Sequence, residues 1–235
     1  MESISYTPVL INDLRHNLDT LADRIRASFN KQFYKGDGRY EPLSQTSLSC
    51  AIHQGLADPS QVDAVRDRLV EAVHTRKDHL DVGILGFKYL LRSLSEHGRA
   101  DLAYRIVTQT DFPSFGHWLK QDATTLWEAW DGGGSHNHIM FGDVSAWFYQ
   151  TLAGINIDPA RPGFKHIILR PQPVGDLNSV RAQTNSPLGP IRSQWQRVGN
   201  RFTWHVSIPA NTTATVCVPT TQPDSVTESG KPVKG

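Results

Sequence analysis

The residue types that do chemistry gather in one segment of the chain, residues 122–138. It holds two tryptophans, three carboxylates, two histidines and three consecutive glycines. This mixture suits neither a helix interior nor a core, and it predicts a loop that presents rings and polar groups to a ligand. Pyranose rings offer C–H faces to aromatic side chains and hydroxyls to imidazoles and carboxylates, and carboxylates are the usual acid and base of glycoside hydrolysis. The segment therefore favours a carbohydrate site.

The same residues also have plainer interpretations. Trp127 and Trp130 could be core anchors at helical i, i+3 spacing. The triple glycine is not followed by the Gly-Lys-Ser/Thr of a phosphate loop, and Ser135 is not framed by the Gly-x-Ser-x-Gly of a nucleophile elbow. A phosphate-binding loop and a serine nucleophile are therefore both disfavoured.

A metal site is a further alternative for this segment. If residues 136–138 formed a strand, His136 and His138 would share a face and could bind a metal together with Asp131 or Asp143. No His-Glu-x-x-His motif and no Cys/His spacing accompanies them. We therefore predict no metal and no cofactor.

The first two thirds of the chain have helical periodicity. In the first helix Leu14, Leu18, Leu21 and Ile25 form one apolar face. Glycine and Asp-Pro breakers separate the later runs and predict helical hairpins. About six helices are expected, near residues 14–25, 44–56, 62–73, 84–94, 99–108 and 142–154.

The pattern changes after Asp158-Pro159. Alternating positions such as Trp195, Phe202 and Trp204 are typical of a half-buried antiparallel sheet, and Gly199-Asn200 predicts a hairpin turn. Strands are expected at 164–169, 191–198, 202–208 and 213–218. We predict a small β-sandwich over residues 159–235 after a helical part over 1–158, with a frayed tail from Thr220 onward.

Composition excludes several classes of protein. The chain has 24 Lys+Arg and 23 Asp+Glu, without a basic cluster, which disfavours nucleic-acid binding. No apolar run is long enough for a membrane span, and the first residues do not resemble a signal peptide, so the chain as given is expected to be soluble. Cys50 and Cys217 are expected to be buried reduced thiols.

Several motifs taken together resemble bacterial α-L-rhamnosidases of glycoside hydrolase family 78. The most specific are Thr-Leu-Trp-Glu at 125–128 and the Ser-His-Asn-His block at 135–138, followed by Phe141-Gly142, Trp147 and Leu-Ala-Gly-Ile at 152–155. Further blocks are similar to that family's helical barrel and C-terminal β-domain. They are Ser-Gln-Thr at 44–46, 79–86, 98–104, 113–116 and 209–214.

The resemblance implies an (α/α)6 barrel followed by a β-sandwich, and hydrolysis of terminal α-L-rhamnose with inversion. Glu128 falls on the family's general base, and His138 falls on its sugar-contacting histidine. Trp130 is a weaker candidate for the wall of the sugar pocket, which would also include Trp127. Asp131 is a local partner of Glu128, but helical spacing would place the two too close for an inverting pair, so we interpret it as structural or hydrogen-bonding.

Half of the expected machinery has no counterpart in the sequence. Nothing among residues 1–127 matches the family's general acid. A twelve-helix barrel needs on the order of 200 residues for helices and connections, and only about six helices precede the β part. The fold expected is therefore an incomplete barrel whose apolar face is left for a partner, either an N-terminal barrel half or a second copy.

Three hypotheses follow. The first is a portion of an α-L-rhamnosidase that carries the base but not the acid and is inactive alone. The second is a non-catalytic module that binds a rhamnose-containing saccharide. The third is an interaction protein or pseudo-enzyme whose open face docks another chain.

Overall fold

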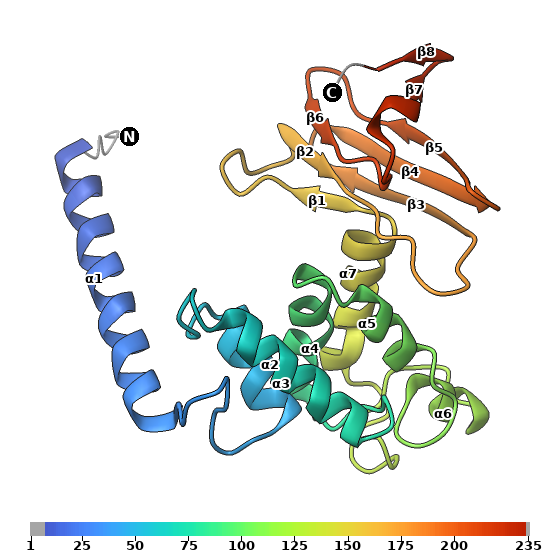
Figure 1. Cartoon of the computed structure of the whole chain (residues 1–235). Coiled ribbons are helices and arrows are strands. Elements are labelled where there is room, and N and C mark those ends of the chain that lie inside the picture. The colour runs from blue at the N-terminus through green and yellow to red at the C-terminus, as the bar shows by residue number, and fades with distance from the viewer. Residues whose placement is uncertain (1–7, 234–235) are drawn as a thin grey trace, which may run out of the picture. The chain divides into compact units, whose positions relative to one another are not determined.

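The computed structural model describes residues 8–233, with side chains from residue 12 onward. The described chain divides between His97 and Gly98 into two compact units. Within the described residues the first unit holds four helices (Figure 1). They are α1 (Pro8–Phe33), α2 (Gln45–His53), α3 (Val62–Thr75) and α4 (Ile84–Glu96).

Helices α2, α3 and α4 form the core of the first unit. Their fully buried side chains lie at helical spacing, as the sequence predicts; they include Leu48, Val65, Leu69, Phe87, Leu90 and Leu94. The hydroxyl of Ser93 donates to the carbonyl of Ser49 across the α2–α4 contact at 2.9 Å. A Cβ on Gly86 would lie 2.2 Å from the Thr46 hydroxyl, so only glycine permits this close approach of the two helices.

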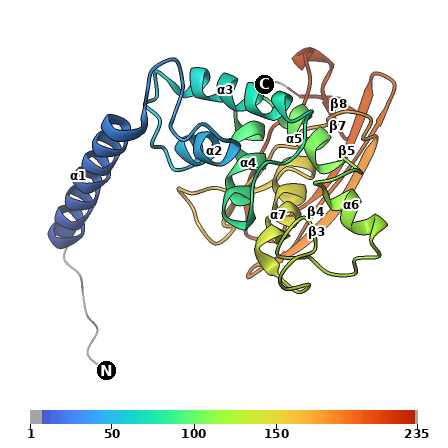
Figure 2. The same cartoon turned by 90° about the horizontal axis from the view of Figure 1, so that it is seen from below.

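Helix α1 is held to its unit only near its C-terminal end. The Arg26 guanidinium donates to the Gly55 carbonyl at 2.8 Å, and the Asn30 amide donates to the Leu56 carbonyl at 2.7 Å. Figures 1 and 2 both show the rest of α1 standing away from α2–α4. Its apolar stripe is 48–59% exposed; the stripe consists of Leu14, Leu18, Leu21 and Ile25. The predicted amphipathic helix is present, but its apolar face has no partner among the described residues.

The helices of the second unit are shorter. They are α5 (Ala100–Val107), α6 (Phe115–Lys120), a 3₁₀ turn η1 (Ile139–Gly142), α7 (Asp143–Trp147) and a π-helical turn η2 (Phe148–Leu152). Helix α6 was not predicted. The helix expected over 142–154 is present as α7 and η2, and the chain leaves it at Gly154.

Two three-stranded sheets follow. The first has the order β1-β2-β6, and the second has the order β3-β4-β5. The strands are β1 (Ile155–Ile157), β2 (His166–Leu169), β3 (Ser179–Ser186), β4 (Gly189–Val198), β5 (Arg201–Ser207) and β6 (Thr213–Val216). Buried residues from both sheets, including Ile155, Ile167, Leu169 and Ile191, form one apolar cluster. The Gly199-Asn200 turn joins β4 and β5 as predicted.

Two details of the β part differ from the expectation. Strands β2 and β6 pair in parallel, with His166 opposite Thr213, so the first sheet is mixed rather than antiparallel. The tail expected to fray instead contains a 3₁₀ turn (Pro223–Ser225) and a small hairpin of β7 (Thr227–Glu228) and β8 (Lys231–Pro232). Backbone hydrogen bonds across this hairpin order the segment despite its polar composition.

Strand β4 is fastened to the end of the last helical turn. The Trp195 indole donates to the Leu152 carbonyl at 2.7 Å, and the Ser193 hydroxyl donates to the Ala153 carbonyl at 2.7 Å. The Trp204 indole in turn donates to the Ser193 hydroxyl at 2.9 Å. All of these groups lie in or beside the core of the second unit.

Two further predictions concern the cysteines and the membrane. Cys50 and Cys217 are both free thiols, but each is half-buried rather than fully buried. Burial nevertheless raises the pKa of the Cys50 thiol. Among the described helices none combines the length and the hydropathy that a bilayer crossing requires.

Candidate active-site loop

The chemistry-bearing segment lies in the second unit, between α6 and η1. Residues 123–138 contain no helix and no strand. Two backbone hydrogen bonds close the segment on itself, from the Glu128 N–H to the Ser135 carbonyl at 2.8 Å and from the His138 N–H to the Leu126 carbonyl at 2.9 Å. The Thr125 hydroxyl bonds the His136 carbonyl between them. The predicted loop is therefore present, with its two limbs tied together.

A cluster of aromatic side chains packs against this loop. Trp118 of α6 is 2% exposed; its ring stacks on Trp130 at 4.5 Å, and its indole donates to the Trp130 carbonyl at 3.0 Å. Phe115 and Phe141 pack against Trp130 at 5.3 and 4.3 Å. Trp118 was not singled out from the sequence, although its place in a short apolar run before the loop could have suggested a support.

The two loop tryptophans pack against other aromatic rings and are not fully exposed to solvent. Trp127 is 9% exposed and Trp130 is half-buried, and both contact Trp118. This packing fits the structural interpretation of the pair as core anchors, but they are held by loop packing and not by helical i, i+3 spacing. Contact of either ring with a sugar stays a prediction.

Glu128 is exposed, and its backbone N–H makes one of the two hydrogen bonds that close the loop. One of its oxygens, Oε2, accepts the Ser135 N–H at 2.9 Å. A Cβ on Gly134 would lie 2.6 Å from that oxygen, and Gly134 has a φ of +75°. Only glycine fits here, because it tolerates this conformation and leaves room for the carboxylate. The third glycine of the triplet therefore leaves the space that the Glu128 carboxylate occupies, and the Ser135 N–H holds the carboxylate there.

The two histidines have different surroundings. His136 stacks on Trp127 with ring centroids 4.3 Å apart, and its Nε2 lies 2.8 Å from the Gly132 carbonyl, to which it donates. His138 is half-buried at the start of η1, and its Nδ1 lies 3.4 Å from the Met140 N–H. His138 thus lies at the second of the two backbone hydrogen bonds that close the loop, and Glu128 lies at the first.

The surroundings of Asp131 and of the two histidines bear on the alternative of a metal site. Asp131 is exposed, and its Oδ1 accepts the Gly133 N–H at 3.0 Å, a bond within the turn. The strand that would align His136 with His138 is not formed. Among the described residues, no three His, Cys, Asp or Glu side chains lie together as metal ligands would.

The chain thus has a helical region followed by a β-domain, with an acidic and aromatic loop between α6 and η1, and the family models identify this arrangement as that of a class of glycosidase. Residues 12–152 match the model of the bacterial alpha-L-rhamnosidase 6 hairpin glycosidase domain, and residues 154–232 match that of the bacterial alpha-L-rhamnosidase C-terminal domain. The chain belongs to the bacterial α-L-rhamnosidase family, as the motifs predicted.

Individual relatives agree with the family. The chain is 36% identical over 217 residues to an α-L-rhamnosidase of Streptomyces avermitilis, which covers 88% of this chain and 21% of that protein. A structure of the S. avermitilis enzyme in complex with L-rhamnose has a TM-score of 0.85 at 34% identity, covering 92% of this chain and 22% of that one. The enzyme of Dictyoglumus thermophilum has a TM-score of 0.81 at 38% identity, covering 87% and 24%.

These relatives confirm the predicted fold class of helices followed by a small β-domain. The chain spans about a fifth to a quarter of the length of the relatives it matches.

Proposed function

We propose that the loop of residues 122–138 forms the water-activating side of an inverting α-L-rhamnosidase site, with Glu128 as its general base. The observation that carries this proposal is the exposed Glu128 carboxylate. It accepts a hydrogen bond from the Ser135 N–H and occupies the space that the missing side chain of Gly134 leaves. Membership of the rhamnosidase family supplies the substrate class.

The reaction follows from the geometry of inversion. The Glu128 carboxylate takes a proton from a water molecule whose oxygen attacks the anomeric carbon of the rhamnoside. The glycosidic bond breaks as the leaving oxygen receives a proton from a carboxylic acid on the opposite face of the ring. Both carboxyl groups must be present, about 6.5 to 9.5 Å apart, to leave room for the water.

The neighbouring residues serve the sugar in this proposal. His138 binds a hydroxyl or orients the water, because it falls on the sugar-contacting histidine of the family that its motif resembles. Trp130 contributes to the sugar wall through its remaining exposed surface, while Trp127 supports the wall through its stack on His136. Asp131 holds the Gly-rich turn through the Gly133 N–H.

The general acid belongs, in this proposal, to helices outside this chain. A six-hairpin domain implies twelve helices, whereas the described residues hold α1–α7. The exposed stripe of α1 is the surface we assign to those helices: Leu14, Leu18, Leu21 and Ile25 would pack against an N-terminal barrel half. If sedimentation instead shows a stable dimer that Leu18→Lys dissociates, the stripe is covered by a second copy.

The activity test uses an aryl α-L-rhamnoside. We expect no hydrolysis by this chain alone and hydrolysis once an N-terminal barrel half is supplied. In that completed enzyme Glu128→Gln should leave folding intact and remove most of the activity, since an amide cannot accept the water proton. Full turnover by the isolated chain would contradict the missing acid, and unchanged turnover of the Gln variant would remove Glu128 from its role.

Binding can be tested on the isolated chain. Titration with L-rhamnose should quench tryptophan fluorescence, and Trp130→Ala should abolish the change. Trp130→Phe keeps a ring in the cluster and controls for loss of packing, and Trp204→Phe, in the sheet, controls for the tryptophan count. Sub-millimolar binding that never leads to turnover in the completed barrel would favour the non-catalytic sugar-binding module.

A further inference from the structure

The outward face of the β3–β5 sheet lacks acidic side chains. Inward and outward residues alternate along all three strands, and the outward ones are exposed. Three arginines and three glutamines lie on this face, together with the imidazole of His205; the six are Arg181, Arg192, Arg201, Gln183, Gln194 and Gln196. We call this surface the arginine–amide face.

The positive charge of this part of the chain is not balanced by acidic residues nearby in the sequence. Leu177 to Pro223 contains no aspartate or glutamate, in a chain whose basic and acidic residues are otherwise nearly equal at 24 and 23. Residues 177–223 are therefore an exception to the mixing of basic and acidic residues along the rest of the chain. On a sheet, residues distant in sequence share one surface.

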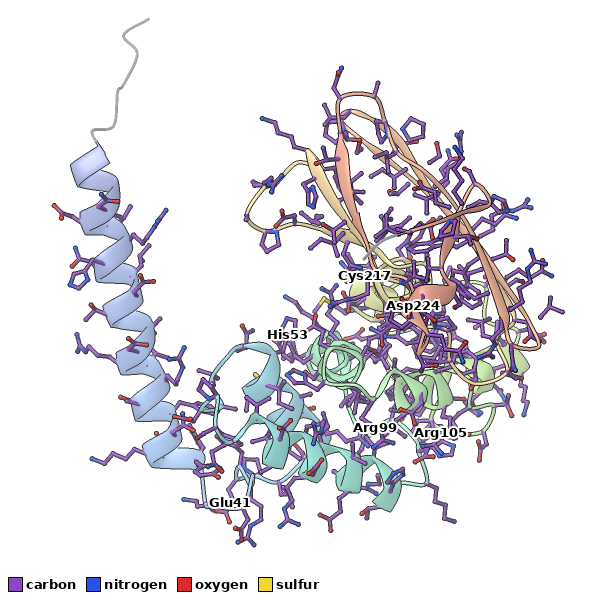
Figure 3. All side chains as sticks on the ribbon, turned by 45° about the horizontal axis from the view of Figure 1, so that its top comes forward. Glu41, His53, Arg99, Arg105, Cys217 and Asp224 are labelled. Carbon is purple, nitrogen blue, oxygen red and sulfur yellow. The ribbon has the colours of Figure 1, made fainter. Side chains whose placement is uncertain are left out.

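Several arginines elsewhere in the chain pair with carboxylates. Arg66 pairs with Asp63 at 2.6 Å, and Arg99 pairs with Asp101 at 3.1 Å beside Arg105 on α5 (Figure 3). Within the described part of the chain, no ion pair involves an arginine of the arginine–amide face. Its guanidinium groups are therefore available to an external anion.

Strand register places these arginines close to amide groups. Arg181 lies opposite Gln194, and Gln183 lies opposite Arg192 on the same two strands. The Arg192 Nε donates to the Gln183 side-chain carbonyl at 2.7 Å, which fixes one edge of that guanidinium. Adjacent strands are about 4.8 Å apart and alternate residues about 7 Å apart, so the face repeats cationic and amide groups on the scale of a sugar residue.

We propose that the arginine–amide face binds an anionic polysaccharide that contains uronic acids; this deepens the proposed rhamnosidase function by naming the kind of polymer that carries its substrate. Guanidinium groups bind carboxylates through two parallel hydrogen bonds, and glutamine side chains donate to and accept from sugar hydroxyls. Uronate sugars offer both partners at each repeat.

The same face is poorly suited to nucleic acid. Single-stranded nucleic acids are bound by stacking bases on aromatic side chains, with a basic groove along the backbone. The aromatic residues of these strands, such as Trp195 and Trp204, are packed on the core side of the sheet. Apart from the imidazole of His205, which lies opposite Gln194, this face carries arginine, amide and other small polar groups, and it favours a hydroxyl-rich anionic chain over stacked bases.

The test is affinity electrophoresis of the full chain in gels containing polygalacturonate, with dextran as the neutral control polymer. We expect polygalacturonate and not dextran to retard the chain, with retardation lost on raising the salt concentration. The triple variant Arg181→Gln/Arg192→Gln/Arg201→Gln should weaken binding at least about tenfold. Arg161→Gln, at an exposed arginine that pairs with Asp158 at 3.8 Å in the same unit, should change it less than about twofold.

A second set of variants guards against misfolding. Gln194→Glu and Gln196→Glu add negative charge at exposed positions and should each weaken binding, while circular dichroism and the thermal midpoint stay close to those of the parent. Equal retardation by dextran, unchanged binding of the triple variant, absence of binding, or tighter binding of an oligothymidylate would each overturn the proposal. Glu128→Gln should bind polygalacturonate normally, so failure of the active-site proposal and failure of this one are distinguishable.

Discussion

Helices α1 and α4 have the same apolar periodicity, but the apolar face of α4 is buried and that of α1 is exposed. In α4, Phe87, Leu90 and Leu94 are fully buried, whereas Leu18 and Leu21 of α1 are about half exposed. Both helices belong to the first unit. An amphipathic pattern therefore establishes that a helix has an apolar face, and it says nothing about where the partner of that face is encoded.

The largest expected effect tests this contrast directly. Leu90→Ala should lower the free energy of unfolding by about 2 to 5 kcal/mol, because it leaves a cavity in a closed core. Leu18→Ala should change it by less than about 0.5 kcal/mol, because that side chain is already largely hydrated. Urea unfolding followed by circular dichroism measures both. An equal loss for Leu18→Ala would show that the stripe is already covered in solution.

The anchor of α1 should give an intermediate effect that depends on pH. Tyr40 is 1% exposed, and its hydroxyl donates to Asn30 of α1 at 2.6 Å. Burial, together with Tyr34 and Asp58, raises the pKa of Tyr40 from 10.0 to about 12. The folded state keeps this proton while the unfolded state loses it, so stability is complete below pH 10 and falls as the pH rises through 12, by up to about 1.4 kcal/mol per pH unit.

Tyr40→Phe identifies the group responsible. This variant should be less stable than the parent at neutral pH, since Asn30 loses its partner, but the difference should shrink between pH 10 and 12. Unfolding free energies at three or four pH values in that range suffice. A constant difference would mean that the pKa of Tyr40 in the folded state is not raised above its value in the unfolded chain.

The smallest effect concerns a purely local interaction. Ser44 caps α2 by accepting the Ser47 N–H at 3.0 Å, while the Ser47 hydroxyl accepts the Ser44 N–H at 3.1 Å. Ser44→Ala should cost about 1 kcal/mol and Ser44→Gly only a few tenths. If thermal unfolding showed a cost for Ser44→Ala as large as that of Leu90→Ala, local capping and not packing would dominate this unit.

Local signals in the sequence were sufficient for much of the fold. Apolar periodicity predicted α2, α3 and α4, and Gly199-Asn200 predicted the β4–β5 turn. Strand β3 was missed because its inward residues are small or polar, such as Ala182 and Thr184, and give no strong alternation. The parallel β2–β6 pairing joins segments far apart in sequence, and no local pattern encodes such a register.

The site was predictable in part for a similar reason. Composition indicated the loop, and the motifs indicated Glu128 and His138, whose roles stay predictions. The sequence could not show that Trp127 and Trp130 are packed inward, because this depends on Trp118 arriving from α6. The role of Gly134 beneath the Glu128 carboxylate depends equally on the loop closing through Ser135.

The hydrogen bonds from Trp195 and Ser193 to Leu152 and Ala153 have a practical consequence. The two family models meet at residues 152 and 154, and excising the β-domain there would remove both acceptors from their donors. An indole and a hydroxyl would be stranded in an apolar interior, each at a cost of roughly 1 to 3 kcal/mol. Evolutionary modules and folding modules therefore have different borders in this chain, and a soluble β-domain will require the preceding helical turns to be carried with it.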